Sequence, residues 1–173
     1  MKSNNLWTMV VLIVIGLCSC GGNSKSSAKI EQGVQAEENA PANIEYTVLE
    51  NYFPKNDIGD ETVMMVLADK ADFDKYLGVA KTMTNDIVTP DFSNNVVAIV
   101  ALPATNKATK LSVVSVNAQG SSAVVNMSQE FGEELSFTMR PSLVIAFPAK
   151  EELESVEFKL EGAASKKVAL PVN

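Results

Sequence analysis

The chain has 173 residues, of which 46% are hydrophobic and 20% charged, and this apolar content suits one packed domain better than two. It has 14 Lys and Arg residues against 21 Asp and Glu residues, and the formal net charge of -7 argues against a nucleic-acid partner, because such a partner needs a positive surface. Histidine is absent, which removes the commonest general base and the commonest transition-metal ligand. We therefore expect no catalytic residue, no metal and no cofactor.

The N-terminus has the pattern of an export signal. Lys2 supplies a positive charge, and Met9–Ile15 is an unbroken apolar run. This run is roughly half of the ~20 residues that a membrane-spanning helix needs, so we interpret residues 1–19 as a signal peptide that is removed. The two cysteines, Cys18 and Cys20, lie at its end, so no disulfide framework is expected further along the chain.

The segment Leu17-Cys18-Ser19-Cys20 resembles the lipobox of bacterial lipoproteins. The resemblance implies that Cys20 becomes the first mature residue and carries acyl chains such as palmitate, which anchor the protein to the membrane. Two or more chains, at about 0.8 kcal/mol per buried CH₂, give stable anchoring. Gly21 follows, and residues 21–25 hold no acidic cluster, which favours the outer membrane facing the periplasm. The alternative is a signal that is cut elsewhere and leaves Cys20 as a free thiol.

Residues 20–43 are expected to form the lipidated cysteine and a flexible tether. Gly, Ser, Asn, Ala and Glu dominate this segment, and Ile30 and Val34 are its only β-branched aliphatic residues. Such a composition cannot bury enough apolar surface to offset the entropy of ordering. The globular domain is therefore predicted to span residues 44–173.

This domain is predicted to be mainly β, an antiparallel sandwich or open barrel with one short packed helix. The helix begins at Asp69 or Asp72, has Phe73 and Tyr76 on its apolar face, and is shortened by Gly78. The run Val96–Leu102 is apolar throughout, as expected for a strand buried on both faces. The other expected strands are 44–53, 62–67, 110–118, 123–131, 135–139, 142–147, 156–160 and an edge strand at 168–172, with turns at 119–122 and 132–134.

The stretch from Phe73 to Leu160, about half of the chain, resembles the C-terminal domain of PrcB-like protease-complex proteins. The resemblance lies in Phe73-Asp74-Lys75-Tyr76, in Asp91-Phe92 before the strand Asn95–Val100, in Leu111–Val116, in Thr138–Pro141 before Leu143–Ile145, and in Val156-Glu157-Phe158. It implies a small β-rich fold and a protease-associated or protease-regulating role. The family has a Gly- and Pro-rich loop ending in an aromatic residue where this chain has residues 103–110, which lack glycine and aromatics. The resemblance therefore transfers no binding residue.

Four candidate sites follow from the residues. The first is a loop between two predicted strands that carries Lys107 and no acid, which we expect to contact a protein partner or to be an ordinary exposed connection. Its residues are Pro103, Ala104, Thr105, Asn106, Lys107, Ala108 and Thr109. The second, Asn56, Asp57, Asp60 and Glu61, could bind Ca²⁺ but lacks EF-hand spacing and is interpreted as a solvated turn. The third, Glu130, Glu133 and Glu134, could supply paired carboxylates but fits a turn better. The fourth is Arg140, the sole arginine, which could clamp a carboxylate of a ligand, pair with an acid of this chain or simply lie on the surface.

The sequence thus favours a lipid-anchored cell-envelope protein whose β-domain binds another protein without catalysis. The alternative is a carboxylate- or lysine-based hydrolase acting on cell-wall or glycan polymers. A purely structural module is a third interpretation. A deep pocket lined by perturbed carboxylates would favour the enzyme.

Overall fold

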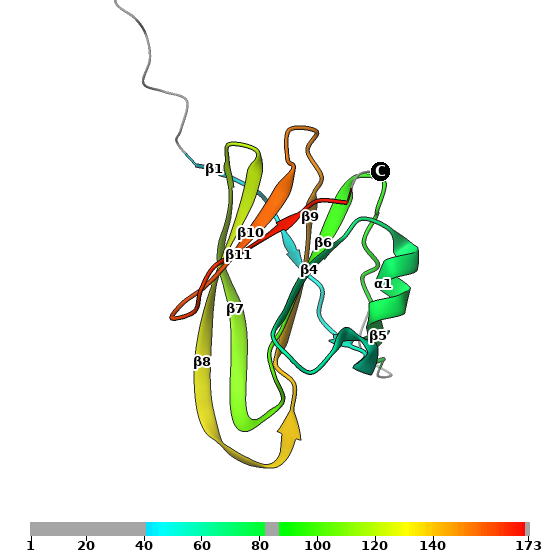
Figure 1. Ribbon diagram of the computed structural model, residues 1–173. Helices are drawn as coiled ribbons and strands as arrows, with labels where there is room; N and C mark the ends of the chain where they lie inside the picture. Colours follow the sequence, from blue (N-terminus) through cyan, green and yellow to red (C-terminus); the bar gives the residue numbers. More distant parts are fainter. Residues whose placement is uncertain (1–40, 82–86, 172–173) are drawn as a thin grey trace, which may run out of the picture. The chain divides into compact units, whose positions relative to one another are not determined.

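The structure is a computed structural model that describes residues 41–81 and 87–171. The predicted signal peptide, Cys20 and the predicted tether up to residue 40 lie outside the described residues. Within them the chain is mainly β with one short α-helix, and its strands pack as a sandwich, which confirms the predicted fold class (Figure 1).

The strands form two packed sheets and one small pair. The five-stranded sheet has the order β1 (Ala42–Asn43), β7 (Thr105–Gln119), β8 (Ser122–Met139), β10 (Ser155–Leu160), β11 (Lys166–Ala169). The four-stranded sheet has the order β2 (Thr47–Val48), β9 (Ser142–Pro148), β6 (Asn95–Ala101), β4 (Val63–Leu67). The small pair consists of β3 (Tyr52–Pro54) and β5 (Leu77–Val79).

The four-stranded sheet is the middle layer of the domain. In β6, Val96, Ala98 and Val100 belong to the cluster that packs against the five-stranded sheet, while Val97 and Ile99 belong to a second cluster on the opposite face. Successive side chains of a strand point to opposite faces, so a strand with apolar neighbours on both sides needs an uninterrupted apolar sequence. This confirms the interpretation of the apolar run at 96–102.

Helix α1 (Lys70–Tyr76) covers the outer face of the four-stranded sheet (Figure 1). The Asp69 carboxylate accepts a hydrogen bond of 2.8 Å from the Asp72 amide, which caps the helix as predicted. Phe73 is buried, and its ring contacts the Tyr52 and Phe92 rings edge-on at 5.0 and 5.4 Å. The 3-10 turn Asn56–Ile58 buries Ile58 in the same cluster.

The predicted strand 44–53 is wrong as a single element, because the chain from Ala42 to Pro54 forms three short strands in three different sheets. β1 begins at Ala42, inside the predicted tether, and the Ile44 amide bonds to the Val116 carbonyl of the five-stranded sheet. The Leu49 amide then bonds to the Val144 carbonyl of the four-stranded sheet. Asn51, at φ 66°, turns the chain into β3. The chain crosses sheets because Ile44 and Leu49 are buried in different clusters.

Two further expectations about the five-stranded sheet are corrected. β8 and β10 run parallel, because the chain crosses from β9 in the other sheet before it enters β10. The predicted turn at residues 132–134 lies inside β8, which continues to Met139. The turn predicted at 119–122 is confirmed, since β7 and β8 are joined through Gly120, at φ 57°.

Candidate functional site

The long strands β7 and β8 continue past the end of β10 as a two-stranded arm, comprising residues 105–112 and 128–139 (Figure 1). The last β8 residue paired with β10 is Met127. In the arm, Thr105 pairs with Met139 and Lys107 with Glu134, so β8 advances by five residues where β7 advances by two. Extra residues in one strand bend the ladder. The arm therefore curves, with its outer ends joined to β6 and β9.

Between the arm and the ends of the four-stranded sheet lies a cavity of about 650 Å³. Its walls come from three places: the arm, the ends of β4, β6 and β9, and the connection from β10 to β11. The lining residues are Thr62, Met64, Leu102, Pro103, Thr105, Lys107, Thr109, Gln129, Phe131, Pro141, Leu160, Ala163, Ala164, Ser165 and Lys166. A cavity of this size falls within the ~300–1,000 Å³ range of small-molecule sites.

Residues 105–109 belong to strand β7, so the prediction of a loop over 103–109 is wrong for most of its length. Thr105, Lys107 and Thr109 line the cavity, whereas Asn106 and Ala108 do not, which is the alternation of a strand. Pro103 also lines the cavity, and Ala104 does not. Sequence reasoning missed this strand because it lacks an apolar stripe. The signal that could have found it is the β-branched pair at 105 and 109 in alternating positions.

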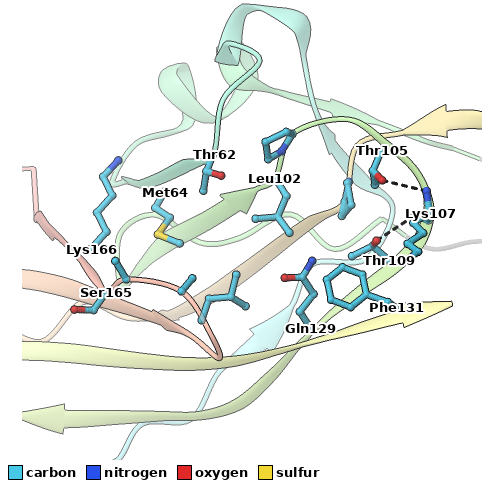
Figure 2. Close-up of a pocket in the computed structure, with 15 residues that line it drawn as sticks. Thr62, Met64, Leu102, Thr105, Lys107, Thr109, Gln129, Phe131, Ser165 and Lys166 are labelled. Atoms are coloured by element: carbon cyan, nitrogen blue, oxygen red, sulfur yellow. Dashed lines mark hydrogen bonds between the residues drawn. The ribbon is translucent and has the colours of Figure 1, made fainter.

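The cavity lining contains two lysines and no carboxylate, although the whole chain has a net charge of -7. Figure 2 shows Lys107 and Lys166 on opposite sides of the cavity, with Met64 and Leu102 between them. The Lys107 ammonium lies 5.8 Å from the centre of the Phe131 ring. The lining therefore offers positive charge and apolar surface together.

Hydrogen bonds fix the backbone on both sides of Lys107. Its amide donates to the Thr105 hydroxyl at 3.1 Å, and its carbonyl accepts from the Thr109 hydroxyl at 3.0 Å (Figure 2). Side-chain hydroxyls that bond to backbone two residues away stabilise local conformation. These two hydrogen bonds stabilise the backbone conformation at Lys107. The Lys107 ammonium forms no ion pair with any described residue.

Arg140 stabilises the wall of the cavity that is formed by the ends of β4, β6 and β9. Its guanidinium donates to three backbone carbonyls: those of Leu102 at 3.0 Å, Glu61 at 2.8 Å, and Gly59. These bonds join the β8–β9 connection to the end of β6 and to the segment before β4. The expected internal partner of Arg140 was an acidic side chain; the partners in the structure are backbone carbonyls instead.

The acidic candidates are not among the residues that line this cavity. Asp57, Asp60 and Glu61 are exposed, and the described residues hold no group of three or more His, Cys, Asp or Glu side chains placed to bind a metal ion. Glu130, Glu133 and Glu134 are exposed on the arm, and none of them lines the cavity. These residues therefore supply no carboxylate to the cavity lining.

The arm also carries two exposed phenylalanines. Phe131 is 66% exposed and Phe137 60% exposed, and both come from the bent part of β8.

No helix within residues 41–81 and 87–171 is long and apolar enough to cross a membrane. Comparisons of the chain with protein-family models, curated proteins and solved structures find no match.

Proposed function

We propose that this protein is a lipid-anchored cell-envelope protein, held at the outer membrane through Cys20, whose β-domain binds a ligand in the cavity under the arm without transforming it. The observation that carries the proposal is the composition of the cavity. Its lining combines a buried apolar floor with lysines, hydroxyls and one amide, and includes no carboxylate. Cavities with a few polar groups on an apolar wall are the usual form of small-ligand sites.

Binding is favoured over glycan hydrolysis by the position of the acids. Hydrolysis of a glycosidic bond needs two carboxyl groups about 5–10 Å apart that face the substrate. Glu130, Glu133 and Glu134, the acids considered for that role, are exposed and outside the cavity. The lysines and hydroxyls of the lining are suited to holding an anionic group in place.

A protein partner, including a protease, is the second candidate. The exposed rings of Phe131 and Phe137 on the arm favour it, because large exposed aromatic side chains are enriched at protein interfaces. The suggestion of a protease rests on the resemblance of residues 73–160 to the PrcB-like domain.

Photocrosslinking in intact cells separates these candidates. A photoreactive residue at Thr105 lies on the cavity side of β7, and one at Asn106, the matched control, lies on the other side. The proposal predicts an adduct from position 105 and none from 106, with the full-length lipoprotein as bait. An adduct from 106 alone would favour the protein partner. The absence of any adduct, or equal adducts from both positions, would contradict binding in the cavity.

A further inference from the structure

The middle of the cavity lining is apolar, and polar groups lie at its margins. The arm supplies Thr105, Lys107 and Gln129 together with Phe131, β4 and β10 supply Met64 and Leu160, and the segment from β10 into β11 supplies Ala163, Ser165 and Lys166. Figure 2 shows Lys107 and Thr105 at one side of the cavity and Met64 toward the other. A ligand that contacts both Lys107 and this apolar middle has a polar end and an apolar end.

The polar end can hold one anionic group. The Lys107 ammonium has no ion-pair partner, although Glu134 lies opposite it in the strand register. Gln129 lies in β8, two residues before Phe131, and its side-chain amide forms no hydrogen bond with any described residue. The Lys107 ammonium is a charged donor that pairs with a carboxylate, and the Gln129 amide N–H is a further donor in the same lining.

The apolar end continues the hydrophobic core. Met64, Leu102 and Leu160 belong to the cluster between the two sheets and are 5%, 8% and 6% exposed. The small side chains of Ala163 and Ala164 complete this wall. These side chains offer no polar atom that could bond to a peptide backbone, whose N–H and C=O groups must be satisfied when buried. An alkyl chain needs no such partner, so it suits this wall better than a peptide.

We propose that the cavity binds a straight-chain amphipathic carboxylate of the fatty-acid class. Its carboxylate lies at Lys107, and its alkyl chain lies over Met64 and Leu160. Electrostatic attraction to Lys107 orients the ligand, and burial of the chain provides most of the affinity. This inference rests on the proposed function, since it takes the cavity under the arm as the binding site.

The test measures the displacement of a fluorescent probe, 11-(dansylamino)undecanoic acid, from the protein. The protein used is a fragment of residues 35–173, which form one compact unit that contains both hydrophobic clusters. Competitors are straight-chain carboxylates of increasing length, used below their micelle concentrations, and the matching alcohols. Affinity is expected to rise about fourfold per CH₂ until the cavity is full, the equivalent of about 0.8 kcal/mol. Each acid should bind about fivefold more tightly than its alcohol, as expected for a solvent-exposed ion pair.

Variants locate the head group and the chain. Lys107→Ala should remove the preference for acid over alcohol, whereas Lys110→Ala, an exposed lysine of the same strand that does not line this cavity, should leave it unchanged. Ala163→Trp should weaken all competitors at least tenfold by filling the apolar end. If Lys166→Ala and not Lys107→Ala removes the preference, the proposed orientation is wrong.

The outcomes also separate this inference from the proposed function. Equal binding of acids and alcohols, or no displacement by either, would overturn the fatty-acid class. If position 105 still gave a crosslink in cells, the cavity would remain a binding site for another ligand, a peptide included. If both experiments were negative, the proposed function would fail as well.

Discussion

Replacement of Arg140 by alanine should destabilise the domain and loosen one wall of the cavity. Arg140 is half-buried and donates to the carbonyls of Leu102, Gly59 and Glu61. These three carbonyls belong to two segments far apart in the sequence, so no local interaction replaces the links once the guanidinium is removed.

The magnitude follows from the surroundings of each bond. The bond to the Leu102 carbonyl is partly buried, and a charge-assisted bond in such a place contributes about 1.5 kcal/mol. The bonds to Gly59 and Glu61 are exposed, so water can replace the guanidinium there, and we assign each a few tenths of a kcal/mol, in line with exposed charged contacts. The free energy of unfolding should therefore fall by about 2 kcal/mol.

Urea denaturation of residues 35–173 measures this change. With a slope of about 2 kcal/mol per M, the midpoint should fall by about 1 M. Arg140→Lys retains the charge but cannot reach three carbonyls, so its midpoint should be intermediate. Lys167→Ala, the control, removes an exposed charge from β11 and should change stability by less than about 0.5 kcal/mol. An Arg140→Ala midpoint equal to that of the control would refute the role assigned to these three bonds.

Three more predictions test the core, one loop and the anchor. The Phe158 side chain is 0% exposed between the sheets, so Phe158→Ala should lower the free energy of unfolding, measured by urea denaturation, by about 3–5 kcal/mol. Val114 is 66% exposed, so Val114→Ala should lower it by less than about 0.5 kcal/mol. Equal losses in the two variants would contradict the packing of Phe158 between the sheets. Hydrogen bonds from Ser93 and Asn94 hold the pKa of the Asp91 carboxyl below its usual range, so its contribution to stability is present above the unfolded pKa and is lost as pH falls through the folded one. Asp91→Asn should therefore be less stable than the parent at pH 7, with the difference shrinking below about pH 4; a difference independent of pH would be inconsistent with this assignment. Cys20→Ala should abolish incorporation of radiolabelled palmitate and leave the signal peptide uncleaved, and persistent labelling would exclude Cys20 as the acylated residue.

The parts of the fold that the sequence predicted correctly are those where burial follows a simple period. The apolar run at 96–102 required a strand with both faces covered, and the structure supplies a layer on each side. The helix after Asp69 was predicted from its cap and from Phe73, and both have these roles. The hairpin turn at Gly120 followed from local turn chemistry.

The parts that the sequence did not predict depend on partners distant in the chain. Residues 105–109 have no apolar stripe, because alternate residues of this segment face the cavity and the others do not. The glutamates at 133 and 134 resemble a turn in sequence, but pairing with β7 keeps them in a bulged strand. Arg140 could not be assigned its three carbonyl partners, since two of them lie about 80 residues earlier. The cavity arises from this non-local pairing and was not foreseen.

The central claim, that a carboxylate of the fatty-acid class binds under the arm, is tested most directly by amide NMR spectra of residues 35–173 recorded during titration with decanoate. We expect saturable shift changes confined to the cavity wall, at Thr105–Thr109, Gln129–Phe131, Met64 and Leu160–Lys166. Lys107→Ala should weaken the titration without moving the affected amides to another surface. Shift changes centred on α1 or on the exposed face of β2, or an absence of saturable changes, would contradict the claim.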